Sequence, residues 1–187
     1  AVKVQRPNVR KIMETDIEIM FYVANLLENH MENIRKFKPV KVVSEFKEWT
    51  EKELDFRLEA RNAKRFYENF KGSNKVKIPK IYDDFTTERV LVLEFIEGVD
   101  INNFKEVRKR KLDTKQIMQN WFESTLLQVY SHGVFHADPH PGNVIVISNS
   151  KIAFVDFGIV GYFDEKLKGQ CVDMMYGIIN QDAEIIM

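Results

Sequence analysis

The chain has 187 residues, a length that suits one domain or two small lobes built around a hydrophobic core. Hydrophobic residues make up 44% and charged residues 30%, which is ordinary for a soluble globular protein. Lys plus Arg and Asp plus Glu both number 28, so we expect no nucleic-acid partner, and no polybasic run favours an anionic membrane. The single cysteine, Cys171, excludes an internal disulfide framework and predicts a reducing, cytoplasmic location.

The first half of the chain is predicted to combine short strands with long helices. Residues 1–5 resemble a strand, and Pro7 and Asn8 offer a turn and a helix start. A helix with an unusually wide apolar surface is predicted for residues 9–30, but its apolar run at 17–27 is too short to span a membrane and contains Glu18 and Asn25. A second, highly charged helix is predicted for residues 40–70, with Gly72 as its stop. Strands are predicted at residues 76–78, 81–85 and 90–95.

The second half carries a helix, a hairpin and a final helix. Residues 97–100 break the strand pattern and are predicted to connect two lobes, and a helix starting at Asp113 or Thr114 ends near Gly133. Residues 144–147 and 151–155 form two predicted strands joined by a turn at 148–150, and Asp164 begins the last helix. Because the chain starts within a predicted strand and stops within a predicted helix, we expect it to be a piece of a longer protein.

The most informative pattern surrounds the predicted hairpin. Asp138 is followed five residues later by Asn143, and Asp156 opens an Asp-Phe-Gly tripeptide thirteen residues beyond Asn143. This spacing is typical of a phosphotransferase catalytic loop, in which Asp138 orients a substrate hydroxyl while Asn143 and Asp156 bind Mg²⁺. The hairpin would bring Asn143 and Asp156 together at one end, where their oxygen atoms can share a cation.

Four motifs in order resemble those of the UbiB/AarF/ADCK group of atypical, protein-kinase-like proteins. They are the Val-Lys-Val strand at residues 2–4, the acidic run at 53–60, the catalytic loop at 136–143 and the Val-Asp-Phe-Gly segment at 155–158. The resemblance covers nearly the whole chain. It implies an α+β, protein-kinase-like two-lobe fold that is truncated at both ends and has a helix-rich insertion in its N-lobe. Residues 1–97 would form the partial N-lobe and residues 98–187 the partial C-lobe.

The resemblance also implies a nucleotide site for ATP with Mg²⁺. Lys3 matches the lysine that binds the α- and β-phosphates, and Glu59 matches its ion-pair partner on the following helix. Glu53 and Asp55 match the acidic E-x-D motif that lies near the nucleotide in relatives. An alanine-rich loop and a K-x-G-Q motif of the family would precede Ala1.

The adenosine part of the nucleotide would contact the segment after the third predicted strand. Glu94 and Ile96 fall where the hinge of a kinase binds adenine through its backbone. Asp100, four residues after Ile96, is placed to reach the ribose. The family link to coenzyme Q synthesis implies partners among lipid or quinone-pathway enzymes, and membrane association would belong to the full-length protein.

Several of these residues have simpler explanations. Asp and Asn are common in turns and helix caps, and acidic runs such as residues 45–59 usually form a solvated face. His132, His136 and His140 recur every four residues and invite a zinc interpretation, which Gly133, Pro139 and Pro141 argue against because they interrupt a helix. His136 is expected to brace the loop, not to shuttle protons.

Three functions remain open. The first is an atypical kinase acting as an ATPase or phosphotransferase in quinone or isoprenoid lipid metabolism. The second is a small-molecule kinase of the aminoglycoside or choline type, which has a similar His-x-Asp loop. The third is a nucleotide-gated scaffold without catalysis. After residue 158 the sequence passes almost directly into a helix, which leaves no room for the long activation loop of ordinary protein kinases.

Overall fold

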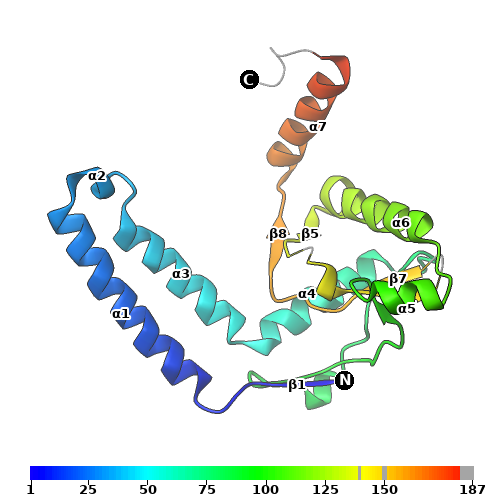
Figure 1. Cartoon of the computed structure of the whole chain (residues 1–187), viewed down its shortest axis with the longest axis horizontal. Coiled ribbons are helices and arrows are strands. Elements are labelled where there is room, and N and C mark those ends of the chain that lie inside the picture. The colour runs from blue at the N-terminus through cyan, green and yellow to red at the C-terminus, as the bar shows by residue number, and fades with distance from the viewer. Residues whose placement is uncertain (139, 149–150, 182–187) are drawn as a thin grey trace. The chain divides into compact units, whose positions relative to one another are not determined.

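The computed structural model describes residues 1–138, 140–148 and 151–181 and divides into two compact units (Figure 1). The first unit comprises Ala1–Ala60 and Tyr82–Leu93, and the second comprises Arg61–Ile81 and Glu94–Met187. Helix α4 (Phe56–Asn69) contributes its first residues to the first unit and its remaining turns to the second. The assignment of residues 1–97 and 98–187 to two kinase lobes stays a prediction.

A pair of long helices makes up most of the first unit. Helix α1 (Val9–His30) has the predicted bounds and lies beside α3 (Pro39–Glu53), with the short α2 (Glu32–Arg35) between them in the chain (Figure 1). Each long helix buries residues spaced two turns apart, because this spacing keeps side chains on one face. The buried residues are Ile17 and Ala24 on α1 and Val43 and Thr50 on α3.

A two-stranded ribbon completes the first unit. Strand β1 (Val2–Val4) pairs antiparallel with β3 (Val90–Val92), and Lys3 lies opposite the buried Leu91. The strand predicted for residues 81–85 is wrong, because the 3₁₀ turn η1 (Asp83–Phe85) occupies most of it. The Thr86 N–H closes this turn on the Asp83 carbonyl at 2.9 Å, in keeping with the turn preference of aspartate.

The single helix predicted for residues 40–70 is also wrong, because the chain forms two helices there. Helix α3 ends at Glu53 and α4 begins at Phe56. The Asp55 carboxylate accepts a hydrogen bond from the Arg57 N–H at 3.0 Å and so caps the start of α4. The Gln5 side chain donates to the Leu54 carbonyl at 2.6 Å, which satisfies backbone exposed by the break.

The second unit contains a four-stranded sheet that includes the predicted hairpin. Strands β6 (Val144–Ser148) and β7 (Lys151–Phe154) pair antiparallel, which confirms the hairpin, while Asn149 and Ser150 of its predicted turn lie outside the described residues. On the flanks, β2 (Val76–Lys77) pairs parallel with β7, and β4 (Val99–Asp100) pairs antiparallel with β6. The segment at 97–100, predicted as a connector, therefore ends in a strand.

Helices and a second ribbon make up the rest of the second unit. The helices are α5 (Phe104–Lys109), α6 (Thr114–Leu126), the π-helical stretch η2 (Leu127–His132) and α7 (Glu165–Asn180). The side chains of Asn103, Asp113 and Asp164 cap α5, α6 and α7. The last two helices begin as predicted, at Asp113 or Thr114 and at Asp164. Strands β5 (Val134–His136) and β8 (Val160–Tyr162) pair antiparallel, and η3 (Pro141–Asn143) is a single 3₁₀ turn. None of the helices within the described ranges combines the length and hydropathy that crossing a bilayer requires.

Candidate functional site

Asp138 and Asn143 are held together by the loop that follows β5. The Asn143 side-chain N–H donates to the Asp138 carboxylate at 3.0 Å and to the Asp138 carbonyl at 3.2 Å. The Asn143 backbone N–H closes η3 on the His140 carbonyl at 2.9 Å, and the His140 ring accepts from the Gly142 N–H. The loop therefore fixes the amide of Asn143 with its nitrogen toward Asp138 and leaves its oxygen for another partner.

Asp156 reaches the same cluster through the β6–β7 hairpin. In the hairpin register Val144 lies opposite Phe154, and the Val155 N–H donates to the Asn143 carbonyl at 3.1 Å. Asp156 directly follows Val155, whose backbone is bonded to Asn143, in keeping with the predicted hairpin. One carboxylate oxygen of Asp156 accepts a hydrogen bond from the Gly158 N–H at 3.1 Å.

Aromatic packing anchors both segments of this cluster. The buried Phe157 ring lies 5.1 Å from the Phe66 ring of α4 and 5.7 Å from the His136 ring, and His136 is 5.8 Å from Phe154. His136 is itself buried, so the structure agrees with a bracing role for its ring. The ring contacts therefore link His136, two residues before Asp138, to Phe157, which directly follows Asp156.

In the first unit, Lys3 and Glu59 form an ion pair. The Lys3 ammonium lies 2.5 Å from a carboxylate oxygen of Glu59, and the Glu59 side chain is only 7% exposed compared with 32% for Lys3. Strand β1 presents the lysine, and the first turn of α4 presents the glutamate. The structure thus brings together the two residues that the resemblance pairs, while their role toward a nucleotide stays a prediction.

The acidic residues Glu53 and Asp55 lie at the junction of α3 and α4. Glu53 is the last residue of α3 and is half-buried. The two oxygens of Asp55 accept from the Arg57 guanidinium at 2.9 Å each, and the hydrogen bond and charge of Asp55 raise the pKa of Arg57. Asp55 therefore has a structural role as a helix cap and ion-pair partner, in addition to its predicted role near the nucleotide.

The predicted hinge has a fixed first residue. The Glu94 N–H donates to the Lys80 carbonyl at 2.8 Å, and the Glu94 carboxylate pairs with the Lys77 ammonium at 2.5 Å. Desolvation opposes ionisation of Glu94, but hydrogen bonds from Lys77 and the Lys80 N–H outweigh it and lower the pKa of the carboxyl. In the described part of the chain the Ile96 N–H has no hydrogen-bond partner, as adenine binding would require.

Asp100 uses its carboxylate within its own turn. The carboxylate accepts from the Asn102 N–H at 2.7 Å, and the Asp100 carbonyl accepts from the Asn103 N–H at 2.8 Å. The side chain is exposed at the end of β4. This Asx turn explains the aspartate locally, so the ribose contact stays a prediction.

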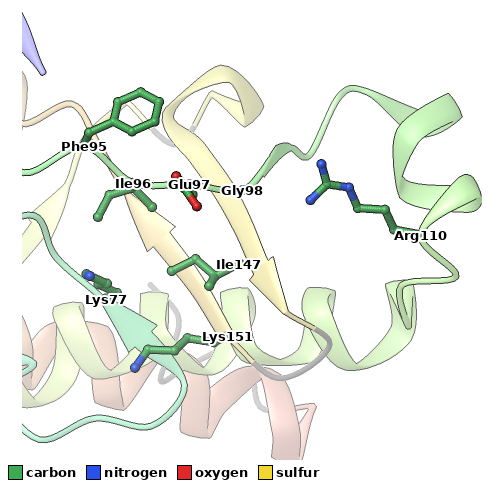
Figure 2. A pocket seen from close by; sticks show the side chains of 8 residues that line it. All are labelled: Lys77, Phe95, Ile96, Glu97, Gly98, Arg110, Ile147 and Lys151. Atoms are coloured by element: carbon green, nitrogen blue, oxygen red, sulfur yellow. The ribbon is translucent and has the colours of Figure 1, made fainter.

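A cavity of about 880 Å³ lies beside the predicted hinge (Figure 2). In Figure 2 the hinge residues follow one another along one segment, with the side chains of Lys77, Ile147 and Lys151 across from them. Asp138, Asn143 and Asp156 do not line it. The cavity and the catalytic-loop cluster are therefore separate features of the second unit. The lining residues are Lys77, Phe95, Ile96, Glu97, Gly98, Arg110, Ile147 and Lys151.

The oxygen atoms of the Asp138, Asn143 and Asp156 cluster suit a hard cation such as Mg²⁺. Carboxylate and amide oxygens are the protein ligands that Mg²⁺ prefers, and the Asn143 amide already has its nitrogen turned to Asp138. No group of three His, Cys, Asp or Glu side chains in residues 1–138, 140–148 and 151–181 is arranged to hold a metal. A cation here would therefore depend on water and phosphate oxygens for the rest of its ligands, as Mg²⁺ commonly does in nucleotide sites.

The three histidines that invited a zinc interpretation have different surroundings. The His132 ring packs edge-on against Phe70 at 5.0 Å, and desolvation lowers its pKa. His136 lies in the aromatic cluster, and His140 holds the turn of η3. Each ring thus has a local structural role.

Two buried or half-buried amides contact the cluster and were missed by the sequence analysis. Gln128 is 1% exposed, and its side-chain oxygen accepts from the His136 N–H at 2.9 Å. Asn62 on α4 donates to the Phe157 carbonyl at 2.9 Å. Each amide lies four residues from a buried side chain on the same helical stretch, Gln128 from Ser124 and Asn62 from Phe66. A polar residue on the buried face of a helix is the signal that could have revealed them.

Comparison with known proteins places the chain in a family. A model of the ABC1 atypical kinase-like domain matches residues 1–187. "Probable protein kinase UbiB" of Aliivibrio fischeri is 34% identical over 185 residues, which cover 97% of this chain and 34% of that protein. "Protein ACTIVITY OF BC1 COMPLEX KINASE 8, chloroplastic" of Arabidopsis thaliana is 32% identical over 190 residues, which cover 100% of this chain and 25% of that protein.

A solved structure supports the fold. Rv3197 from Mycobacterium tuberculosis, determined as a complex with erythromycin, matches with a TM-score of 0.78 at 23% identity, and the match covers 99% of this chain and 46% of that one. At this identity the likeness concerns the fold alone, which is the predicted kinase-like α+β fold. The chain spans a quarter to a third of the length of the two curated relatives described above. On the match over all its residues, the chain belongs to the ABC1 atypical kinase-like family.

Proposed function

We propose that this protein binds ATP with Mg²⁺ and transfers the γ-phosphoryl group to water or to another acceptor. The observation that supports this most strongly is the hydrogen bond of 3.0 Å from the Asn143 amide to the Asp138 carboxylate. It orders a potential proton acceptor and a potential metal ligand in one loop, with Asp156 adjacent through the hairpin. Positioning of this kind accounts for most of the catalysis in phosphoryl transfer.

In this proposal Asp138 acts on the acceptor. Its carboxylate accepts the proton of the acceptor hydroxyl while the acceptor oxygen bonds to the γ-phosphorus and the bond to the β-phosphate oxygen breaks, so ADP leaves. The Asn143 side chain keeps the carboxylate in place, because it donates to one of its two oxygens. Asn143 and Asp156 would hold Mg²⁺, which would supply charge neutralisation at the phosphates.

Lys3 and Glu59 are proposed to act on the same nucleotide. A lysine ammonium neutralises the α- and β-phosphates as a point charge, and a carboxylate partner restricts the long lysine side chain. The ion pair of 2.5 Å between the two residues supports this role. The hinge backbone at Glu94 and Ile96, with Asp100, and the acidic pair Glu53 and Asp55 remain proposed nucleotide contacts.

The proposed physiological setting is quinone or isoprenoid lipid metabolism. It rests on the likeness to a protein named UbiB and to a plant protein named ACTIVITY OF BC1 COMPLEX KINASE 8. In this setting we propose lipid or quinone-pathway enzymes as partners. A small-molecule kinase and a nucleotide-gated scaffold are the competing functions.

The Asp138→Asn variant tests the catalytic part of the proposal. Its side chain has the same shape but cannot accept the acceptor proton, so single-turnover phosphate release should fall at least about a hundredfold, within the range typical of general-base catalysis. Affinity for Mg²⁺ and ATP should change by less than about threefold. Lys115→Gln, at an exposed position of α6, is a suitable control and should keep wild-type turnover. Turnover that survives in Asp138→Asn would contradict the proposed role of Asp138.

A further inference from the structure

Asn62 on α4 links the Asp-Phe-Gly segment to the end of β8. Its side-chain nitrogen donates to the Phe157 carbonyl at 2.9 Å, and its side-chain oxygen accepts from the Tyr162 hydroxyl at 3.1 Å. We call these three residues, Asn62, Phe157 and Tyr162, the Asn62 bridge. Asn62 is half-buried on α4, and Tyr162 is the last residue of β8.

The bridge acts on one peptide group. The Phe157 carbonyl that accepts from Asn62 and the Gly158 N–H belong to the same peptide unit, which is planar, so the two groups cannot turn independently. In a trans peptide they point in opposite directions. The Gly158 N–H donates to the Asp156 carboxylate at 3.1 Å. A bond on one side of the peptide therefore sets the direction of the bond on the other side, and each polarises the other.

The Phe157 ring is fixed by the same helix. Phe66 lies four residues after Asn62 on α4, so both side chains lie on one face of the helix. The Phe66 ring contacts the Phe157 ring at 5.1 Å, while Asn62 holds the carbonyl of the same residue. The backbone and the side chain of Phe157 are thus tied to α4 at two points, which prevents rotation of the peptide that follows.

Tyr162 determines which way the Asn62 amide faces. A hydroxyl that donates to the amide oxygen leaves the amide nitrogen for the Phe157 carbonyl. The guanidinium of Arg65, which also lies on α4, is 5.3 Å from the centre of the Tyr162 ring. Strand β8, which carries Tyr162, pairs with β5 immediately before the loop of Asp138.

We propose that Asn62 is a positioning residue that orients the Asp156 carboxylate for Mg²⁺ through the Phe157–Gly158 peptide. This inference rests on the proposed function, because it deepens the role of Asp156 in binding the metal with ATP. It adds a residue outside the catalytic loop, the Asp-Phe-Gly tripeptide and the Lys3–Glu59 pair. Asn62 touches neither nucleotide nor metal in this role and acts only through the peptide.

Three variants test the two bonds of the bridge. Asn62→Asp has the same shape and still accepts from Tyr162, but it cannot donate to the Phe157 carbonyl, and Asn62→Leu removes the donor without adding charge. Tyr162→Phe removes only the bond to the amide oxygen. Arg65→Leu is the matched control on the same helix, because it removes the cation beside the ring and leaves both hydrogen bonds.

The first measurement is hydrogen exchange of the Gly158 amide by NMR on the purified protein without nucleotide. Exchange should be at least about tenfold faster in Asn62→Asp and Asn62→Leu, because an N–H that loses its fixed direction also loses its bond to Asp156. Tyr162→Phe should show a smaller increase, and Arg65→Leu should match the wild type. Wild-type exchange in both Asn62 variants, with unchanged melting temperature, would overturn the proposal.

The second measurement is the affinity for ATP with Mg²⁺ and with EDTA, by calorimetry. In the two Asn62 variants the affinity for ATP with Mg²⁺ should be about tenfold weaker than in the wild type, while the affinity measured in EDTA should be unchanged. A general loss of structure would weaken both affinities. Equal losses in both conditions would overturn the metal-orienting role. If the wild-type protein gains no affinity from Mg²⁺, the proposed function fails, while the Gly158 amide still decides whether Asn62 holds the Asp156 segment.

Discussion

Removal of the Lys3 ammonium should destabilise the protein, because it leaves a carboxylate in a site with little access to water. The Glu59 side chain is 7% exposed and the Lys3 side chain 32% exposed, with 2.5 Å between their charged atoms. Breaking a fully buried pair costs about 3–5 kcal/mol and breaking a surface pair about 0.2–1 kcal/mol. Because one partner is buried and the other is about one-third exposed, we expect Lys3→Met to lower the free energy of unfolding by about 2 kcal/mol.

A double-mutant cycle tests this reasoning. Glu59→Gln in the Lys3→Met background should restore part of the lost stability, because the buried negative charge is removed, giving a coupling energy of about 1–2 kcal/mol. The assay is urea unfolding followed by circular dichroism. The exposed pair Lys71 and Glu68, at 3.2 Å, is the control, and Lys71→Met should cost less than about 0.5 kcal/mol. The reasoning is refuted if Lys3→Met costs no more than Lys71→Met or if the coupling energy is zero.

Two further predictions concern stability. Desolvation lowers the pKa of His132, so the unfolded chain binds a proton that the folded chain resists, and stability should fall as the pH drops below about 6.5. In unfolding curves between pH 8 and pH 5.5, His132→Leu should weaken the pH dependence of stability, while His30→Leu, at an exposed position, should leave it unchanged. If both variants show the same pH dependence, desolvation of His132 is not its cause. A Cβ on Gly161 would lie 2.1 Å from the Phe135 ring, so Gly161→Ala should cost about 1–3 kcal/mol. In the helical control Gly169→Ala, where nothing lies within 4 Å, stability should rise by about 0.5–1 kcal/mol, and a cost equal to that of Gly161→Ala would contradict the clash.

The elements that could be predicted from the sequence are those with strong local signals. The helix at residues 9–30 and the β6–β7 hairpin follow directly from the spacing of apolar residues. The start of α7 follows from Asp164, whose carboxylate accepts from the Leu167 N–H at 2.7 Å. The Asn143 carbonyl bonds to the N–H of Val155, the residue before Asp156, because the register of the predicted hairpin brings its two ends side by side.

The missed elements depend on contacts between distant residues. The break between α3 and α4 is stabilised by Gln5 and by the Glu88 carbonyl, which accepts from the Phe56 N–H at 3.0 Å, and neither is near in sequence. The strands β5 and β8 have three residues each and are stabilised by pairing with one another. The sequence alone carries too little periodicity in such short segments to indicate a strand.

Within the candidate site, the residues that form motifs were predictable and the residues that support them were not. Asp138 and Asn143 have a characteristic spacing, whereas Asn62 and Gln128 contribute single hydrogen bonds to backbone groups of other segments. A lone amide on a helix has many common explanations. Only the structure shows which carbonyl or N–H it meets.

The most direct test of the central claim is thermal unfolding of the purified protein titrated with ATP, with Mg²⁺ and with EDTA. Ligand at one hundred times its dissociation constant should stabilise the folded state by about 2.7 kcal/mol. We predict that this stabilisation requires Mg²⁺ and disappears in Asp156→Ala. Stabilisation of equal size in EDTA, or its persistence in Asp156→Ala, would contradict the proposed Mg²⁺–ATP site.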